Sequence, residues 1–90
     1  MDISFDPVKR AWTLRERGLD CSGAAEVFSG LTFTQEDQRR DYGEVRCITA
    51  GYLASRFVVL VWTQRGLGRH IISMRFGHER EERRWRGRLG

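Results

Sequence analysis

Lysine is almost missing from this sequence, although the chain is basic overall. Lys9 is the only lysine among sixteen basic residues, the other fifteen are arginine, and twelve acidic residues leave a net charge of +4. Guanidinium groups stay charged at physiological pH, present a planar fork that matches phosphate oxygens, and stack on nucleobases. The arginine excess therefore favours a phosphate or RNA partner, although a GC-rich genome would give the same composition.

Metal ligands, paired cysteines and long apolar runs are also scarce. Cys21 and Cys47 stand apart without a CxxC motif, and His70 and His78 are the only histidines. These spacings argue against a zinc site or a disulfide framework, so we expect no metal, no cofactor and reduced thiols. The first fifteen residues lack the apolar core of a signal peptide, and no apolar run reaches the roughly 20 residues that cross a bilayer. These features predict a cytoplasmic protein without membrane contact.

The remaining composition suffices for a small folded core. The chain has 90 residues, of which 40% are hydrophobic and ten are aromatic. A chain of this size forms one domain, here residues 1–90, and buries only about 60–65% of its unfolded surface. We expect a globular protein with a thin core.

Two helices are predicted near the N-terminus. Asp6-Pro7 is a helix-start signature, because the carboxylate caps free N–H groups and proline is tolerated at the first helical position. This helix should end at Arg17, before Gly18. Its apolar face is formed by Val8, Ala11, Trp12 and Leu14.

Asp20 predicts the cap of a second helix that continues through Ser29. Phe28 and Leu31 should face inward with its other apolar residues, and Trp12 and Phe28 have the spacing of core residues.

Four strands should follow, at Leu31–Thr34, Glu44–Tyr52, Arg56–Gln64 and Arg69–Arg75. The third contains FVVLVW and is predicted to be central. The connections are short, which requires antiparallel neighbours. Ile3–Phe5 is a short apolar run that adds a possible fifth strand.

A basic helix is predicted at the C-terminal end, over His78–Leu89. Its first turns are acidic and its end is rich in arginine, an order that complements the helix dipole. Only Trp85 and Leu89 can anchor it, so it should be the least stable element.

Several segments form an ordered pattern along the chain. They are Phe5-Asp6-Pro7-Val8-Lys9, Leu14-Arg15 with Gly18, Ala24-Ala25 with Val27-Phe28, Asp37 with Gly43-Glu44-Val45-Arg46 and Ile48-Thr49-Ala50-Gly51, Ile71-Ile72-Ser73-Met74-Arg75, and Glu81 with Trp85. In order and spacing this pattern resembles the BrnT family, the toxin of the BrnT–BrnA toxin–antitoxin system.

The resemblance implies a RelE-like α+β fold, with two N-terminal helices and one C-terminal helix around a four-stranded antiparallel sheet. It also implies a type II toxin with ribonuclease activity that stops translation. A BrnA-like antitoxin would neutralise the toxin, as a heterotetramer, and would bring the complex to promoter DNA.

The sequence departs from the family pattern at several polar positions. Glu16-Arg17 stands where the family often has Lys-His, and Arg40 where it often has histidine. His70 replaces the arginine before Ile-Ile-Ser, and His78 replaces the Thr or Ser that caps the last helix.

Four residues are the candidate catalytic groups. Arg75 ends a strand beside a helix N-terminus that is itself suited to anions, so it is the first candidate for stabilising a scissile phosphate. Arg46 and Glu44 share a strand face and form either a clamp with an orienting carboxylate or a structural ion pair. His78 is a candidate general acid, because an imidazole can exchange a proton in the physiological pH range. His70 alternates with Ile72 and Met74 and is interpreted as a residue at the edge of the core.

Further arginines are candidate RNA contacts: Arg65 and Arg69 flank the predicted hairpin, and Arg80, Arg83 and Arg84 lie on the last helix. This basic helix would equally suit an acidic antitoxin segment or serve solubility alone. Phe57 and Trp62 lie on opposite faces of the central strand, so one of them is expected to stack on RNA bases. The alternative functions are a non-catalytic RNA- or ribosome-binding module and a protein-interaction module.

Overall fold

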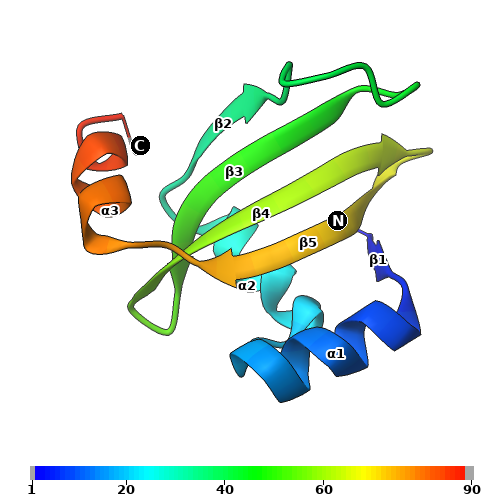
Figure 1. The fold of residues 1–90 in the computed structure, drawn as a ribbon, viewed down its shortest axis with the longest axis horizontal. Coiled ribbons are helices and arrows are strands. Elements are labelled where there is room, and N and C mark those ends of the chain that lie inside the picture. The colour runs from blue at the N-terminus through cyan, green and yellow to red at the C-terminus, as the bar shows by residue number, and fades with distance from the viewer. Residues whose placement is uncertain (1, 89–90) are drawn as a thin grey trace.

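A five-stranded mixed sheet organises the fold in a computed structural model that describes residues 2–88 (Figure 1). The elements in chain order are β1 (Ile3–Phe5), α1 (Pro7–Arg17), the 3₁₀ turn η1 (Cys21–Gly23), α2 (Ala24–Ser29), β2 (Phe33–Glu36), β3 (Arg46–Leu53), β4 (Arg56–Arg65), β5 (Gly68–Phe76) and α3 (Glu79–Arg86). The α+β class is therefore confirmed.

The strand order β1-β5-β4-β3-β2 places β4 at the centre, as its apolar sequence predicted. Strands β2 to β5 are antiparallel neighbours. The four predicted strands are thus antiparallel, and the N-terminal strand that the sequence left open is present as β1. It pairs in parallel with β5, so the sheet has five strands and is mixed rather than wholly antiparallel. The RelE-like arrangement that the resemblance implied differs in this detail.

The two faces of the sheet have different covers. Val58, Leu60 and Trp62 of β4 pack against the N-terminal helices and form the main core. We call this side the helix-covered face, and α2 lies behind the sheet on this side in Figure 1. The other side, which carries Phe57 and Val59, is the open face.

Helix α3 covers one end of the open face. Its Trp85 packs on Phe33 of β2 with ring centroids 5.0 Å apart, and the Tyr52 hydroxyl donates to Glu82 at 2.7 Å. Phe57 is buried beneath this end, and Trp62 is buried on the helix-covered face. The prediction that one of these two rings stacks on RNA is therefore wrong.

Helix α1 begins and ends where predicted, but the side that was predicted to be buried faces solvent. Asp6 accepts a hydrogen bond from the Val8 N–H at 2.9 Å, and Gly18 ends the helix with φ 70°. Trp12, predicted to be core, is 41% exposed, while Thr13 is buried. The helix is held through its polar side, where Arg10 pairs with Asp20 at 2.8 Å, so its apolar side faces outward.

The second predicted helix is split into η1 and α2, since Asp20 caps the 3₁₀ turn by accepting from the Ser22 N–H. Phe28 is half-buried against the core, but Leu31 is 64% exposed, contrary to prediction.

Several boundaries also move. β2 begins at Phe33 rather than Leu31, and β3 begins at Arg46, so Glu44 lies in the preceding loop. α3 ends at Arg86, and Leu89, the predicted anchor, lies outside the described residues. None of the helices described within residues 2–88 is long and apolar enough to span a membrane.

Candidate active site

A row of polar residues crosses the open face at the end away from α3. The strand register places Ser4 beside His70, His70 opposite Thr63, and Thr63 opposite Arg46. Asp37 continues the row, because its N–H donates to the carbonyl of Arg46 at 2.7 Å. Directly opposed residues lie about 5 Å apart at Cα, so the row brings side chains from distant parts of the chain within reach of one ligand.

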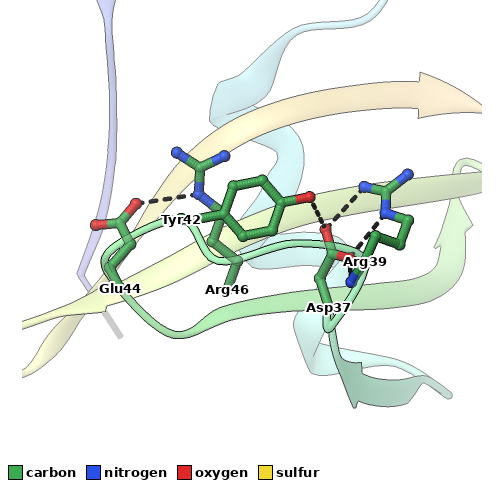
Figure 2. A network of polar contacts seen from close by, with 5 residues as sticks. All are labelled: Asp37, Arg39, Tyr42, Glu44 and Arg46. Atoms are coloured by element: carbon green, nitrogen blue, oxygen red, sulfur yellow. Dashed lines mark hydrogen bonds and ion pairs between the residues drawn. The ribbon is translucent and has the colours of Figure 1, made fainter.

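Arg46 is the best-positioned cation of this row. Its Nε donates to Glu44 at 3.1 Å, and its guanidinium lies 4.2 Å from the centre of the Tyr42 ring (Figure 2). Its two terminal nitrogens make no hydrogen bond within residues 2–88. The side chain is only 25% exposed. The structure thus fixes the guanidinium and leaves donors for a ligand. The predicted pair of Arg46 and Glu44 is in contact, but Glu44 reaches Arg46 from the loop before β3 and not from a shared strand face.

The loop between β2 and β3 is organised by a buried carboxylate. Asp37 accepts two hydrogen bonds from the Arg39 guanidinium, at 2.8 and 2.7 Å, and one from the Tyr42 hydroxyl at 3.0 Å (Figure 2). Mainly through the bonds from Arg39, the pKa of Asp37 is held well below its usual range. The ordered loop in turn holds Tyr42 against Arg46. The sequence pattern included Asp37 in the family resemblance but gave it no structural role.

A hollow beside this loop does not suit a phosphate. Its lining includes Glu36, Asp37, Asp41 and Glu44, with only Arg40 as a basic group. An anion is repelled by that concentration of carboxylates. A phosphate therefore fits the open sheet face better than the hollow.

Arg75 and His78 form a second cluster, under the start of α3. Arg75 donates to both carboxylate oxygens of Glu81, at 2.9 and 2.8 Å, and Glu81 also accepts from the His78 N–H at 3.3 Å. These bonds, that from Arg75 foremost, lower the pKa of Glu81. His78 is exposed at the N-cap of α3. The guanidinium of Arg75 is thus more fully engaged than that of Arg46.

The two clusters share the open face but lie at its opposite ends. Arg75 pairs with Val59 on β4, whereas Arg46 pairs with Thr63. The two positions differ by four residues along the strands and by two strands across the sheet. The Cα atoms of Arg46 and Arg75 are therefore about 16 Å apart. The two guanidinium groups are held by different carboxylates, Arg46 by Glu44 and Arg75 by Glu81. The hydrogen bond to Glu81 raises the pKa of Arg75, and the positive charge of Arg39 acts in the opposite direction.

The five predicted RNA-binding arginines do not lie together. Arg65 is on the open face, where its charge reaches His70. Arg69 is on the other face, over the rings of Phe28 and Trp62 at 4.5 and 4.2 Å, so it does not join the open-face surface. The remaining three are exposed on α3 and form no ion pair among residues 2–88: Arg80, Arg83 and Arg84.

Sequence reasoning missed His70 because of a β-bulge. Strict alternation placed it with Met74 at the core edge. Trp62 pairs with Ile71 but Val61 pairs with Ser73, so Ile72 is an extra residue in β5. His70 therefore shares the open face with Ser73 and Arg75. Its ring nitrogen Nδ1 lies 2.9 Å from the Ser4 hydroxyl, and burial, followed by the charge of Arg65, lowers its pKa. Only the pairing register could have revealed this position.

Comparison with known families identifies the class. The family described as "Ribonuclease toxin, BrnT, of type II toxin-antitoxin system" matches residues 5–81. The basic α+β protein is thus a ribonuclease toxin of the type II toxin–antitoxin class. The chain belongs to the BrnT family, which implies an RNA substrate and an antitoxin protein as partner. No curated protein matches the chain.

Proposed function

We propose that this chain is an endoribonuclease that cleaves RNA on the open sheet face without a metal ion and thereby blocks translation. The guanidinium of Arg46, fixed by Glu44 and Tyr42 with both terminal nitrogens free among residues 2–88, carries the proposal. Such a preorganised group stabilises the charge that grows on a phosphate in the transition state. Arginine cannot carry the proton itself, because its pKa lies far above working pH.

The other predicted residues take secondary roles in this proposal. Glu44 orients Arg46 through the 3.1 Å contact. Arg75 and His78, at the far end of the open face, bind the RNA strand on one side of the scissile phosphate. Arg65 adds positive potential at the reaction end. RNA binds along the basic helix α3 through Arg80, Arg83 and Arg84, and Arg69 is left out because it stacks on the other face.

We further propose that residues 1–90 act as one cytoplasmic domain whose partner is a BrnA-like antitoxin, in a heterotetramer. The exposed arginines of α3 suit an acidic antitoxin segment as well as RNA, so binding of one would exclude the other. Promoter DNA would be bound only through the antitoxin.

The test is expression of the chain alone and together with its antitoxin, followed by an assay of the purified protein on 5′-labelled RNA in EDTA. We expect growth arrest that the antitoxin relieves, and new RNA ends in the presence of the chelator. Normal growth with abundant folded protein contradicts the toxin activity. Salt-dependent RNA binding without new ends indicates instead a non-catalytic RNA- or ribosome-binding module.

Arg46→Ala should lower the cleavage rate by about 10²–10³, the usual cost of one preorganised donor. Arg56→Ala is the matched control, because Arg56 stacks on Phe76 at 4.0 Å on the helix-covered face. Equal losses in both variants would mean that general charge, not the position of Arg46, supports the activity.

A further inference from the structure

We infer that His70 is the general base of the cleavage reaction, held in place by Ser4 and facing Arg46 across Thr63. This inference rests on the proposed ribonuclease activity and names a catalytic residue that the sequence pattern assigned to the core edge. It depends on three features of the open face.

The first feature is the register. His70 and Arg46 both oppose Thr63, one from β5 and the other from β3. Their Cα atoms are therefore about 10 Å apart, two strand spacings, with both side chains on the same face. Thr63 between them is short, is covered by neighbouring groups (3% exposed), and donates its hydroxyl to the carbonyl of Val45 at 2.7 Å, so it forms a low, shielded floor. A phosphodiester above this floor can contact the guanidinium on one side and the imidazole on the other.

The second feature is the hydrogen bond that orients the ring. The Ser4 hydroxyl oxygen of β1 lies 2.9 Å from Nδ1 of His70. In the tautomer whose Nδ1–H donates to this oxygen, Nε2 is the acceptor that is left for a ligand. A base whose other nitrogen is fixed by a neighbouring group is the arrangement that general-base catalysis requires. Ser4 is thus a positioning residue, and β1 contributes to the site through it.

The third feature is the charge environment. Burial is the main cause that lowers the pKa of His70, and the charges of Arg65 on β4 and Lys9 on α1 act in the same direction. Glu44, from the loop before β3, and Asp6 before α1 act in the opposite direction. The lower pKa favours the neutral form of the ring, which is the form that accepts a proton.

The step balances without an added reactant. Nε2 of neutral His70 takes the proton of the ribose 2′-hydroxyl while O2′ forms a bond to phosphorus and the bond from phosphorus to O5′ breaks. Arg46 donates to the non-bridging oxygens as their charge rises. The imidazolium releases its proton to solvent and the leaving O5′ takes one from water, so one proton moves from O2′ to O5′. The products are a 2′,3′-cyclic phosphate and a 5′-hydroxyl.

The experiment compares wild type, His70→Gln and His70→Ala on one labelled RNA, with a 2′-O-methyl analogue as the uncleavable ligand. Glutamine can still bond to Ser4 but does not accept a proton near pH 7. We expect the cleavage rate to fall by about 10²–10⁴ in both variants, while affinity for the analogue changes less than about threefold. Wild-type cleavage should rise with pH through a pKa below the usual value for histidine, and the variants should lack this limb.

Added imidazole should restore part of the activity of His70→Ala, and it should not restore Arg46→Ala. If His70→Gln cleaves at the wild-type rate and with the wild-type pH profile, the assignment of His70 is overturned, but the ribonuclease proposal stands. Wild type that binds RNA without cleaving it overturns both. Unchanged affinity for the analogue distinguishes loss of the base from loss of the fold.

Discussion

The ion pair of Arg75 and Glu81 allows a quantitative test of what Arg75 does. Its two hydrogen bonds, at 2.9 and 2.8 Å, join β5 to α3, and the side chains are 41% and 16% exposed. A half-exposed pair lies between a surface ion pair and a buried charged hydrogen bond, so we expect a coupling energy of about 1–2 kcal/mol. Arg75→Ala should cost slightly more than Glu81→Ala, because it leaves the more buried carboxylate without its partner.

Urea unfolding of wild type, both single variants and the double variant measures this coupling directly. A double-mutant cycle isolates the pairwise contribution. Because Arg75 lowers the pKa of Glu81, the stabilisation is complete above the carboxyl's unfolded pKa and is lost as pH falls through the lower, folded value. A coupling energy below about 0.3 kcal/mol at pH 7, the scatter of independent sites, would refute this account of the pair.

RNA binding by the same variants separates anchoring from contact with the substrate. If Arg75 contacts RNA as proposed, Arg75→Ala should weaken binding and reduce the salt slope by about 1. Glu81→Ala frees the guanidinium and should preserve or strengthen binding. Equal losses in the two variants would show that Arg75 serves only to anchor α3.

Three further changes address the loop, the α3 junction and the clamp. Asp37→Asn should lower the free energy of unfolding by about 1–3 kcal/mol, because the amide cannot replace both charged bonds to Arg39. Urea unfolding measures this free energy, and an unchanged midpoint would contradict the role that we give to Asp37 in ordering the loop. Gly77→Ala should lower the free energy of unfolding by about 1–3 kcal/mol, because the added methyl would overlap the buried Phe57 ring. A thermal unfolding midpoint equal to that of wild type would show that the ring can move aside. Arg46→Lys keeps the charge but loses the planar fork, so cleavage should fall at least about tenfold with little change in RNA affinity; full activity would mean that charge alone suffices.

Local signals in the sequence were sufficient wherever one residue determines the backbone. Asp6, Pro7 and Gly18 specified the ends of α1, because capping and left-handed geometry depend on adjacent residues. The apolar run of β4 likewise indicated the central strand. The outward side of α1 could not be predicted, since Trp12 has the same helical spacing whether it faces a core or solvent.

The strand face on which each site residue lies could not be predicted from the alternation of polar and apolar residues alone. The proximity of Glu44 and Arg46 could be predicted because they are two residues apart. The position of His70 could not, since one extra residue in β5 reverses the faces of all residues before it. The Asp37 network was equally hidden, because a sequence rich in charges does not reveal which carboxylate becomes buried.

The parallel pairing of β1 with β5 has a consequence for the cell that makes this toxin. Ser4 reaches His70 across 66 positions of sequence, so the first strand has no neighbour until the last strand of the sheet has been synthesised. N-terminal segments emerge from the ribosome first. A nascent chain that still lacks β5 already contains Ser4 but not His70, so the proposed site is not assembled until β5 has been synthesised and has paired with β1.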